Sequence, residues 1–184
     1  MKIIPTKFKE VVIVEPDVFA DQRGFFMETY NEKRYNDHGI LSAFVQDNIS
    51  LSSKGTLRGL HFQITKPQAK LVSAITGAIF DVAVDIRTGS PTFGEWVGAI
   101  LDENNKQQLL VPEGFAHGFC VISETAHVLY KCSNLYDRND EGGILWSDPD
   151  IGINWPIDPP VLSDRDKNNR FLKDISAEQL YSPM

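Results

Sequence analysis

The chain has 184 residues, a hydrophobic content of 42% and a formal net charge of −7. This length fits one domain (residues 1–184) with a single core, and the composition is that of a globular rather than a disordered chain. The acidic balance argues against a nucleic-acid partner, which needs a broad basic face, although a few cations in one cleft can still hold a small anion.

The expected setting is the cytoplasm. The apolar runs are short, and the run at residues 78–84 is interrupted by Asp81, so no membrane partner is expected. The first five residues lack the long apolar stretch of a signal peptide. Cys120 and Cys132 lie in apolar surroundings and are expected to be buried reduced thiols rather than a disulfide framework.

The first half of the chain predicts short strands and one helix. A first strand at residues 11–14 stops before Pro16, and a second at 25–30 is entered through Arg23-Gly24. Residues 31–38 predict a helix that ends at Gly39, a residue suited to a left-handed C-terminal cap. Further strands are expected at residues 44–51 and 57–63.

Later strands come in pairs around turn residues. Residues 70–75 and 78–86 flank Thr76-Gly77, a two-residue hairpin signal. The other pairs are 95–101 with 107–111 and 116–122 with 127–133. Since no helical crossover separates these strands, the pattern predicts an all-β sandwich or barrel rather than a parallel α/β sheet.

The composition changes after Tyr136 to Asp, Asn, Gly and Pro. We expect a barrel core at about residues 10–136 and a C-terminal tail, residues 137–184, wrapped on the barrel. Trp146 and Trp155 are the expected anchors of this tail, and a short helix is expected near residues 176–181.

Histidine is the commonest acid or base near neutral pH. His38 at the predicted helix end and His127 at a strand start are expected to be structural or solvent-facing. His61 lies among apolar neighbours, and His117 shares a strand face with Phe115 and Phe119. Either one alone is more often a hydrogen-bonded core histidine, but two on an all-β scaffold favour a site inside the barrel.

Asp81 and Asp85 alternate with apolar residues on one expected strand, and two interpretations are equally open. They could face the interior and be paired there, or they could point to water.

The remaining residues are typical of metal-free acid–base chemistry. Metal-binding β-barrels of this size often use a His-x-His pair, but here the sequence is His61-Phe62-Gln63. There is no Gly-x-Ser-x-Gly elbow and no glycine-rich phosphate loop that opens a helix. No metal and no cofactor are therefore expected.

Several motifs, taken together and in order, resemble one family over nearly the whole chain. They are Arg23-Gly24-Phe25-Phe26 with Glu28, Gln46-Asp47-Asn48, Leu57-Arg58-Gly59-Leu60-His61-Phe62-Gln63, Lys70-Leu71-Val72, Asp81 to Arg87, Pro112 to Phe119, Tyr130-Lys131, Tyr136 and Leu162-Ser163-Asp164-Arg165-Asp166. The chain resembles the dTDP-4-dehydrorhamnose 3,5-epimerases, metal-free members of the cupin superfamily. The resemblance implies a cupin-type jelly-roll β-barrel with short peripheral helices, working as a homodimer on a dTDP-4-keto-6-deoxyhexose.

The same resemblance implies a role for each catalytic residue. His61 would be the base, and Asp166 would orient its imidazole. Tyr130 would be the acid on the other face of the sugar, and Lys70 would stabilise the enolate oxygen. A C4 ketone acidifies the protons at C3 and C5, so the implied reaction turns dTDP-4-dehydro-6-deoxy-D-glucose into dTDP-4-dehydro-L-rhamnose.

The resemblance also implies a set of substrate contacts, with Tyr136 stacking on the thymine. The set is Arg23, Glu28, Gln46, Asn48, Arg58, His117, Tyr136, Glu141 and Arg165. Arg165 departs from the family, which usually has lysine at this position, and the two side chains are not equivalent where geometry is tight.

Three alternatives stay open at this stage. Two are enzymes on a similar substrate, a single-carbon epimerase and a 3,4-ketoisomerase, which share the same base and enolate. The third is a sugar-binding barrel without catalysis, which would have no need of His61, Tyr130, Lys70 and Asp166.

Overall fold

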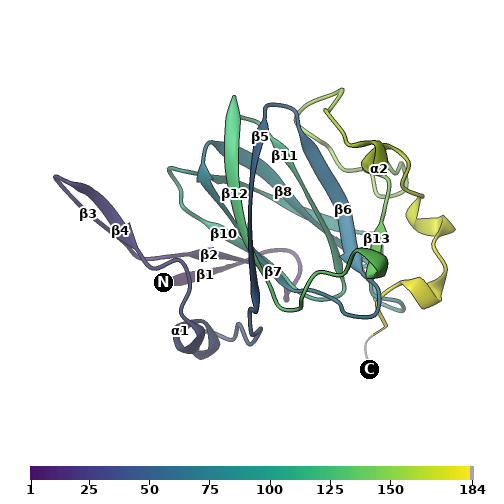
Figure 1. The fold of residues 1–184 in the computed structure, drawn as a ribbon. Helices are drawn as coiled ribbons and strands as arrows, with labels where there is room; N and C mark the ends of the chain where they lie inside the picture. Colours follow the sequence, from purple (N-terminus) through teal and green to yellow (C-terminus); the bar gives the residue numbers. More distant parts are fainter. Residues whose placement is uncertain (183–184) are drawn as a thin grey trace.

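The fold is a sandwich of two antiparallel β-sheets that face each other (Figure 1). The computed structural model describes residues 1–182. One sheet has six strands, in the order β1 (Lys2–Pro5), β2 (Val12–Glu15), β10 (Gln108–Val111), β7 (Lys70–Thr76), β12 (Thr125–Cys132) and β5 (Gln46–Ser53). The other has five, in the order β13 (Glu141–Gly143), β6 (Leu57–Gln63), β11 (Phe115–Val121), β8 (Ala78–Asp85) and β9 (Trp96–Asp102). The expected all-β, cupin-type jelly roll is confirmed.

The tight turns between the central strands mostly carry the chain from one sheet to the other. Strand β7 lies between β10 and β12 in the six-stranded sheet, whereas β8 lies between β11 and β9 in the five-stranded sheet. The prediction of a hairpin at Thr76-Gly77 is therefore wrong, because β7 and β8 do not pair with each other. A turn signal shows where the chain reverses, but the pairing of β7 and β8 is decided by strands that are distant in sequence. Gly77 is required there because its φ is +71° and a Cβ would lie 2.0 Å from the Thr125 carbonyl oxygen.

The main core lies between the sheets, where alternate side chains of each strand point inwards. Phe115 and Phe119 of β11 and Val128 of β12 are among its buried members. Tyr130 packs against this core from the six-stranded sheet. Apolar side chains thus fill part of the space between the two sheets, and the Tyr130 ring packs against them.

The tail covers the outer face of the five-stranded sheet (Figure 1). Its buried residues Ile151 and Leu172 pack in one cluster with Val82 and Val84 of β8. Trp155 packs edge-on against Phe80, with 6.0 Å between ring centroids. The tail contributes β13 to the sheet edge and carries α2 (Asp164–Lys167) and the 3₁₀ helices η1 (Arg138–Asp140), η2 (Leu172–Asp174) and η3 (Ala177–Gln179). The last of these lies where the sequence predicts a short helix.

A hairpin stands away from the sandwich near the N-terminus (Figure 1). It consists of β3 (Val18–Asp21) and β4 (Gly24–Met27). The strand expected at residues 25–30 ends early, at Met27, and β3 is absent from the expected elements. We call β3, β4 and the turn between them the arm.

The helix expected at residues 31–38 is confirmed as α1 (Glu32–Asp37). The Asn31 side chain accepts a hydrogen bond from the Arg34 backbone amide and caps the helix, and Gly39 follows with φ +85°. His38 is the C-cap residue, with its Nδ1 2.8 Å from the Arg34 carbonyl oxygen. Its expected structural role is confirmed.

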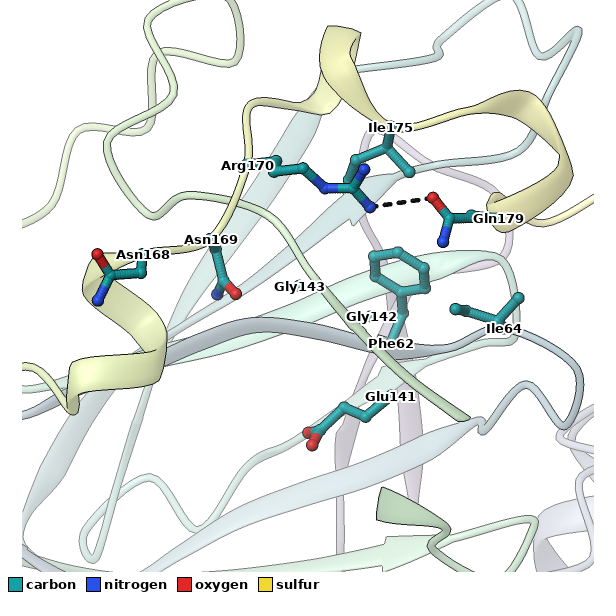
Figure 2. Close-up of a pocket in the computed structure, with 10 residues that line it drawn as sticks. All are labelled: Phe62, Ile64, Glu141, Gly142, Gly143, Asn168, Asn169, Arg170, Ile175 and Gln179. Carbon is teal, nitrogen blue, oxygen red and sulfur yellow. Dashed lines mark hydrogen bonds between the residues drawn. The ribbon is translucent and has the colours of Figure 1, made fainter. Parts of the chain in front are cut away.

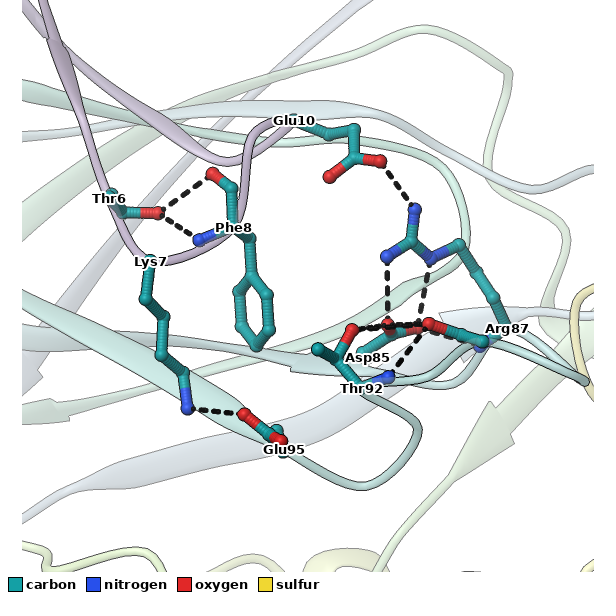
Figure 3. Close-up of polar contacts among 9 residues, drawn as sticks. Thr6, Lys7, Phe8, Glu10, Asp85, Arg87, Thr92 and Glu95 are labelled. Atoms are coloured by element: carbon teal, nitrogen blue, oxygen red, sulfur yellow. Dashed lines mark hydrogen bonds and ion pairs between the residues drawn. The ribbon is translucent and has the colours of Figure 1, made fainter.

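Both carboxylates of β8 face the interior and are 0% exposed, which decides between the two interpretations left open by the sequence. Asp85 accepts hydrogen bonds from Arg87 Nε at 2.9 Å and from the Thr92 hydroxyl at 2.7 Å (Figure 3). It also accepts from the Ser90 hydroxyl at 2.6 Å. This network closes the loop between β8 and β9. Asp81 points towards the candidate site described below.

Two further expectations concern membranes and cysteines. Within residues 1–182, no helix is long and apolar enough to cross a lipid bilayer. Cys120 and Cys132 are both buried free thiols, as expected.

Candidate active site

A cavity of about 620 Å³ lies between the two sheets and is bordered by the tail. It brings together residues that are far apart in the sequence. All the predicted site residues except Arg23 and Glu28 line it: Gln46, Asn48, Arg58, His61, Lys70, His117, Tyr130, Tyr136, Glu141, Arg165 and Asp166.

A bulge in β6 places both Arg58 and His61 in this cavity. Residues three apart on a regular strand point to opposite faces. Here β6 has one extra residue relative to β11, because His61 pairs with His117 while Arg58 pairs with Phe119. Gly59 makes the bulge possible: its φ is +137°, and a Cβ would lie 2.5 Å from the Gly118 Cα.

His61 is held by a carboxylate from the tail. Its Nε2 lies 2.6 Å from Oδ1 of Asp166, whose side chain is only 4% exposed. A carboxylate only accepts hydrogen bonds, so in this contact Nε2 carries the hydrogen and Nδ1 is left as the nitrogen that can take up a proton. The expected pairing of His61 with Asp166 is present in the structure.

Arg165 and Glu141 complete the surroundings of the base. The Arg165 guanidinium forms an ion pair with Glu141 and places Nη2 2.7 Å from Nε2 and 3.3 Å from Nδ1 of His61. With Nε2 protonated towards Asp166, Nδ1 is the imidazole nitrogen that can accept a hydrogen bond from Arg165. Burial lowers the pKa of His61, the Asp166 contact opposes this, and the Arg165 cation adds to the lowering. The imidazole is therefore neutral near pH 7, as a base must be.

Tyr130 lines the cavity from the opposite sheet. It lies on β12, which pairs with β5 and β7, whereas His61 lies on β6. Burial raises the pKa of the Tyr130 hydroxyl, while the nearby Arg58 cation opposes the rise. The phenol therefore keeps its proton near neutral pH and is able to donate it.

Lys70 opens β7 and turns its amine into the same cavity. Burial lowers its pKa, and the carboxylates of Glu141 and Asp81 oppose this effect. In such a buried space a lysine cation acts strongly on a nearby oxyanion.

His117 is fixed from behind by a carboxylate that the sequence alone did not assign to the site. Its Nε2 lies 2.7 Å from Oδ1 of Asp81, and both residues are buried. The pairing could have been suspected from the strand alternation, which places Asp81 on the inward face of β8.

The mouth of the cavity carries a half-exposed aromatic ring. Tyr136 is 48% exposed, and its hydroxyl donates to Glu141 Oε2 at 2.8 Å. Its backbone amide donates to Gln46 Oε1 at 2.9 Å. Gln46 Nε2 in turn donates to Asn48 Oδ1 at 3.0 Å. These contacts hold the ring beside the cavity, where it stays half exposed.

Gln63 stands where a His-x-His pair would have its second histidine. Its side chain forms hydrogen bonds with backbone groups. Its Nε2 donates to the carbonyl oxygens of Lys66 at 2.9 Å and Leu135 at 3.3 Å, and its Oε1 accepts from the Asp137 amide at 2.7 Å. The side chain therefore has its hydrogen-bonding groups engaged and fastens the loop that carries Tyr136. This role is not visible in the sequence, because the loop is more than 70 residues away.

Arg23 and Glu28 do not lie at the cavity of their own chain. Arg23 is at the turn of the arm and pairs with Asp21 at 2.6 Å, with 84% of its side chain exposed. Glu28 follows β4 and pairs with Arg34 at 3.2 Å. Placing these two residues in the site of the same chain is not supported by this structure.

A second, smaller hollow lies behind β13 and shares Glu141 and Phe62 with the larger cavity. Figure 2 shows Asn169 and Arg170 of the tail on one side of it, with Arg170 hydrogen-bonded to Gln179 at 3.0 Å. None of the predicted acid–base residues lines it.

Comparison with known proteins identifies a family for this chain. A family model described as dTDP-4-dehydrorhamnose 3,5-epimerase matches residues 5–174. The chain is 53% identical over 176 residues to the dTDP-4-dehydrorhamnose 3,5-epimerase of Shigella flexneri, covering 95% of this chain and 97% of that protein. It is 40% identical over 174 residues to the dTDP-4-dehydrorhamnose 3-epimerase of Streptomyces niveus, covering 94% of this chain and 84% of that protein.

The fold is similar to solved structures over its whole length. A crystal structure of dTDP-6-deoxy-D-glucose-3,5-epimerase from Legionella pneumophila, in complex with dTDP-4-keto-L-rhamnose, matches with a TM-score of 0.96 and 49% sequence identity. The match covers 100% of this chain and 98% of that chain.

Proposed function

The chain belongs to the dTDP-4-dehydrorhamnose 3,5-epimerase family, and from this membership we propose that it converts dTDP-4-dehydro-6-deoxy-D-glucose to dTDP-4-dehydro-L-rhamnose. The observation that carries the proposal is the placement of a base and an acid on opposite walls of one cavity, His61 on β6 and Tyr130 on β12. Inversion of a carbon requires a proton to leave from one face and return to the other, and this arrangement serves both steps.

Proton removal is the task of His61 in this proposal. The C4 ketone of the substrate acidifies the hydrogens on C3 and C5, so a base held beside either carbon forms an enolate. The lowered pKa keeps the imidazole neutral and ready to accept the proton. The Asp166 carboxylate, 2.6 Å from Nε2, then stabilises the imidazolium that results.

Lys70 stabilises the negative charge that moves to the ketone oxygen. Its amine lines the cavity from the start of β7 and brings a cation to the space in which the charge develops. Tyr130 then delivers a proton to the opposite face of the enolate. Its raised pKa means that the phenol is protonated before the reaction starts.

The remaining cavity residues bind the nucleotide and sugar. Arg58 and Arg165 offer donors to the pyrophosphate, for which the guanidinium fork is well suited, and His117 is a further substrate contact. Tyr136 stacks on the thymine. Gln46, Asn48 and Glu141 add polar contacts around it.

We further propose that the working form is a homodimer in which the arm of one chain reaches the cavity of its partner. Phe19, Phe25 and Phe26 of the arm are 63%, 58% and 71% exposed, an apolar surface that a second chain would bury. Arg23 and Glu28 lie at or next to the arm and away from their own cavity. In a dimer they would supply the two substrate contacts that a single chain lacks.

The proposed location is the cytoplasm. Cys120 and Cys132 are buried as free thiols, the state expected where thiols are kept reduced.

The reaction as proposed uses no metal and no cofactor. The supporting observation is Gln63, whose amide is bonded to three backbone groups where a metal-binding barrel would present a histidine. Activity should survive exhaustive dialysis against a chelator. Loss of activity that a divalent metal restores would overturn the metal-free mechanism.

The deciding experiment is NMR of the protein with dTDP-4-dehydro-6-deoxy-D-glucose in heavy water. Deuterium should enter at both C3 and C5, and the inverted sugar should form. His61→Ala should abolish both exchanges while the affinity for dTDP stays within about tenfold of wild type, since the base is not a nucleotide contact.

Other outcomes point to the other functions. Exchange and inversion at one carbon would identify a single-carbon epimerase, as in the Streptomyces niveus relative. Transfer of the ketone from C4 to C3 would identify a 3,4-ketoisomerase. Tight binding without any exchange would leave a sugar-binding barrel.

A further inference from the structure

We propose that Ser163 is a positioning residue that fixes the Asp166 carboxylate behind the base. The Ser163 hydroxyl donates to Asp166 Oδ2 at 2.8 Å, and the other carboxylate oxygen, Oδ1, lies 2.6 Å from His61 Nε2. The three side chains thus form a continuous chain, Ser163 to Asp166 to His61. This inference rests on the proposed role of His61 as base.

The burial of Asp166 makes its second oxygen important. The side chain is 4% exposed, and a buried carboxylate is costly unless hydrogen-bond donors reach its oxygens. Burial alone would raise the pKa of Asp166, but the hydrogen bonds from His61 and Ser163, with the nearby Arg165 cation, hold it below its ordinary value. Ser163 therefore helps to keep this carboxylate ionised and pointed at the imidazole.

The local backbone explains how one serine does this. Ser163 is the N-cap of α2, and its Oγ accepts from the Asp166 backbone amide at 3.1 Å while its hydroxyl hydrogen goes to the Asp166 carboxylate. The same side chain fixes both the backbone and the rotamer of Asp166. A competing explanation is that Ser163 only caps the helix and that its bond to the carboxylate has no consequence.

Three substitutions separate these explanations. Glycine is accepted at N-caps but has no hydroxyl, so Ser163→Gly keeps most of the cap and removes the bond to the carboxylate. Ser163→Asp also caps, but it cannot donate and places a second negative charge beside Asp166. Ser163→Thr keeps both functions and is the conservative control.

We expect kcat to fall by about tenfold in Ser163→Gly and by more in Ser163→Asp, because the carboxylate is no longer held behind the base. Ser163→Thr should stay within about twofold of wild type, and the dissociation constant of dTDP should stay within about twofold in all three. Wild-type kcat in both Ser163→Gly and Ser163→Asp would show that Ser163 is only a helix cap. Thermal unfolding of each variant checks that the chain is folded.

A second readout needs no substrate and therefore does not depend on the proposed function. The proton shared by His61 Nε2 and Asp166 should give a far-downfield ¹H resonance, identified by its absence in His61→Asn. The resonance should shift or broaden in Ser163→Gly and persist in Ser163→Thr. If the wild type shows no epimerisation but the resonance responds in this way, the proposed function fails and the positioning role stands. An unchanged resonance in Ser163→Gly overturns the positioning role even if the wild type is an active epimerase.

Discussion

At the scale of single residues, Arg165 is the cation nearest to the proposed base, His61. Its guanidinium contacts the imidazole of His61 and is anchored by Glu141. Lysine would bring the same charge, but as a compact ammonium that cannot bridge the carboxylate and the ring in one plane. Arg165 is thus both an expected substrate contact and part of the electrostatic setting of the base.

This setting predicts a change in pH dependence. Burial and the Arg165 cation both lower the pKa of His61, so the acid limb of kcat/KM should lie below pH 6.5, the ordinary value. Arg165→Met removes the cation, which should raise the pKa of His61 and move the acid limb to higher pH. Arg165→Lys should leave the limb close to its wild-type position. An acid limb that does not move in Arg165→Met would show that Arg165 has no electrostatic effect on the base.

Tyr130 offers the sharpest test of a two-sided mechanism. Tyr130→Phe keeps the ring that packs on the core and removes only the hydroxyl. His61 should still remove protons, so exchange with heavy water should continue to some degree. Formation of the inverted sugar should fall by about a hundredfold or more, the usual scale for the loss of a general acid. A folded variant with a near wild-type rate of product formation would mean that another group protonates the enolate.

At the scale of elements, the loop at residues 135–137 is held by hydrogen bonds from two strands of the barrel, and these bonds position Tyr136 beside the cavity. Gln63 of β6 and Gln46 of β5, from opposite sheets, both bond to the backbone of residues 135–137. The ring of Tyr136 is therefore positioned by two amides that lie far from it in sequence.

Gln63→Glu tests this fastening. The carboxylate still accepts from the Asp137 amide, but it cannot donate to the carbonyl oxygens of Lys66 and Leu135 and is repelled by them. We expect dTDP to bind about tenfold more weakly, as measured by calorimetry, while kcat changes by less than about threefold. The loss of dTDP affinity in Tyr136→Leu shows how large the effect is when the aromatic ring is removed. Wild-type affinity in Gln63→Glu would contradict the proposed role of this side chain.

The loop between β8 and β9 carries a prediction on stability. Burial opposes ionisation of Asp85, but hydrogen bonds from Arg87, Ser90 and Thr92 outweigh it and lower the pKa to about 2, from 3.8. Because the folded state holds this carboxylate ionised, its contribution to stability is present above pH 3.8 and is lost as the pH falls towards 2. The shift corresponds to about 2 kcal/mol.

Urea unfolding of wild type and Asp85→Asn at pH 7 and pH 3 measures this contribution. The variant should be less stable at pH 7, and the difference in free energy of unfolding should narrow by roughly 1 to 2 kcal/mol at pH 3. Glu124→Gln is the control, since Glu124 belongs to an exposed ion pair and its side chain is 90% exposed. That variant should differ from wild type by less than about 0.5 kcal/mol at both pH values.

Much of the element list could be predicted from the sequence, because alternation and turn residues are local signals. Strand β6 and helix α1 are found where the patterns place them. The pairing at Thr76-Gly77 could not be predicted, because it depends on β10 and β12, which arrive later in the chain. The contacts of Gln63 with Leu135 and Asp137 were missed for a related reason: a polar side chain gives no local signal of a partner far away in sequence.

At the scale of the whole molecule, the arm is the feature that a single chain does not explain. Three of its phenylalanines are exposed, and Arg23 lies 84% exposed at its turn. The family resemblance implies that Arg23 and Glu28 are substrate contacts, but it does not say which chain's site they enter. In the proposed dimer each cavity is completed by the arm of the other chain.

Mixing two defective variants tests this exchange of arms. His61→Ala removes the base, and Arg23→Ala removes the arm contact, so each homodimer should have little activity. In a mixed dimer the Arg23→Ala chain still has His61, and it receives an intact arm from the His61→Ala chain. One of the two cavities of the mixed dimer is then complete, while the other lacks both His61 and Arg23.

Co-refolding or co-expression of the two variants should therefore restore activity. With random pairing, half of the dimers are mixed and each has one complete cavity, so about a quarter of wild-type activity is expected for an isologous dimer. Size-exclusion chromatography with light scattering should show a dimer in every sample. Substituting the arm phenylalanines by serine should weaken the dimer. If Arg23 acted in the cavity of its own chain, every cavity in the mixture would lack one residue and activity would stay at the level of the separate variants.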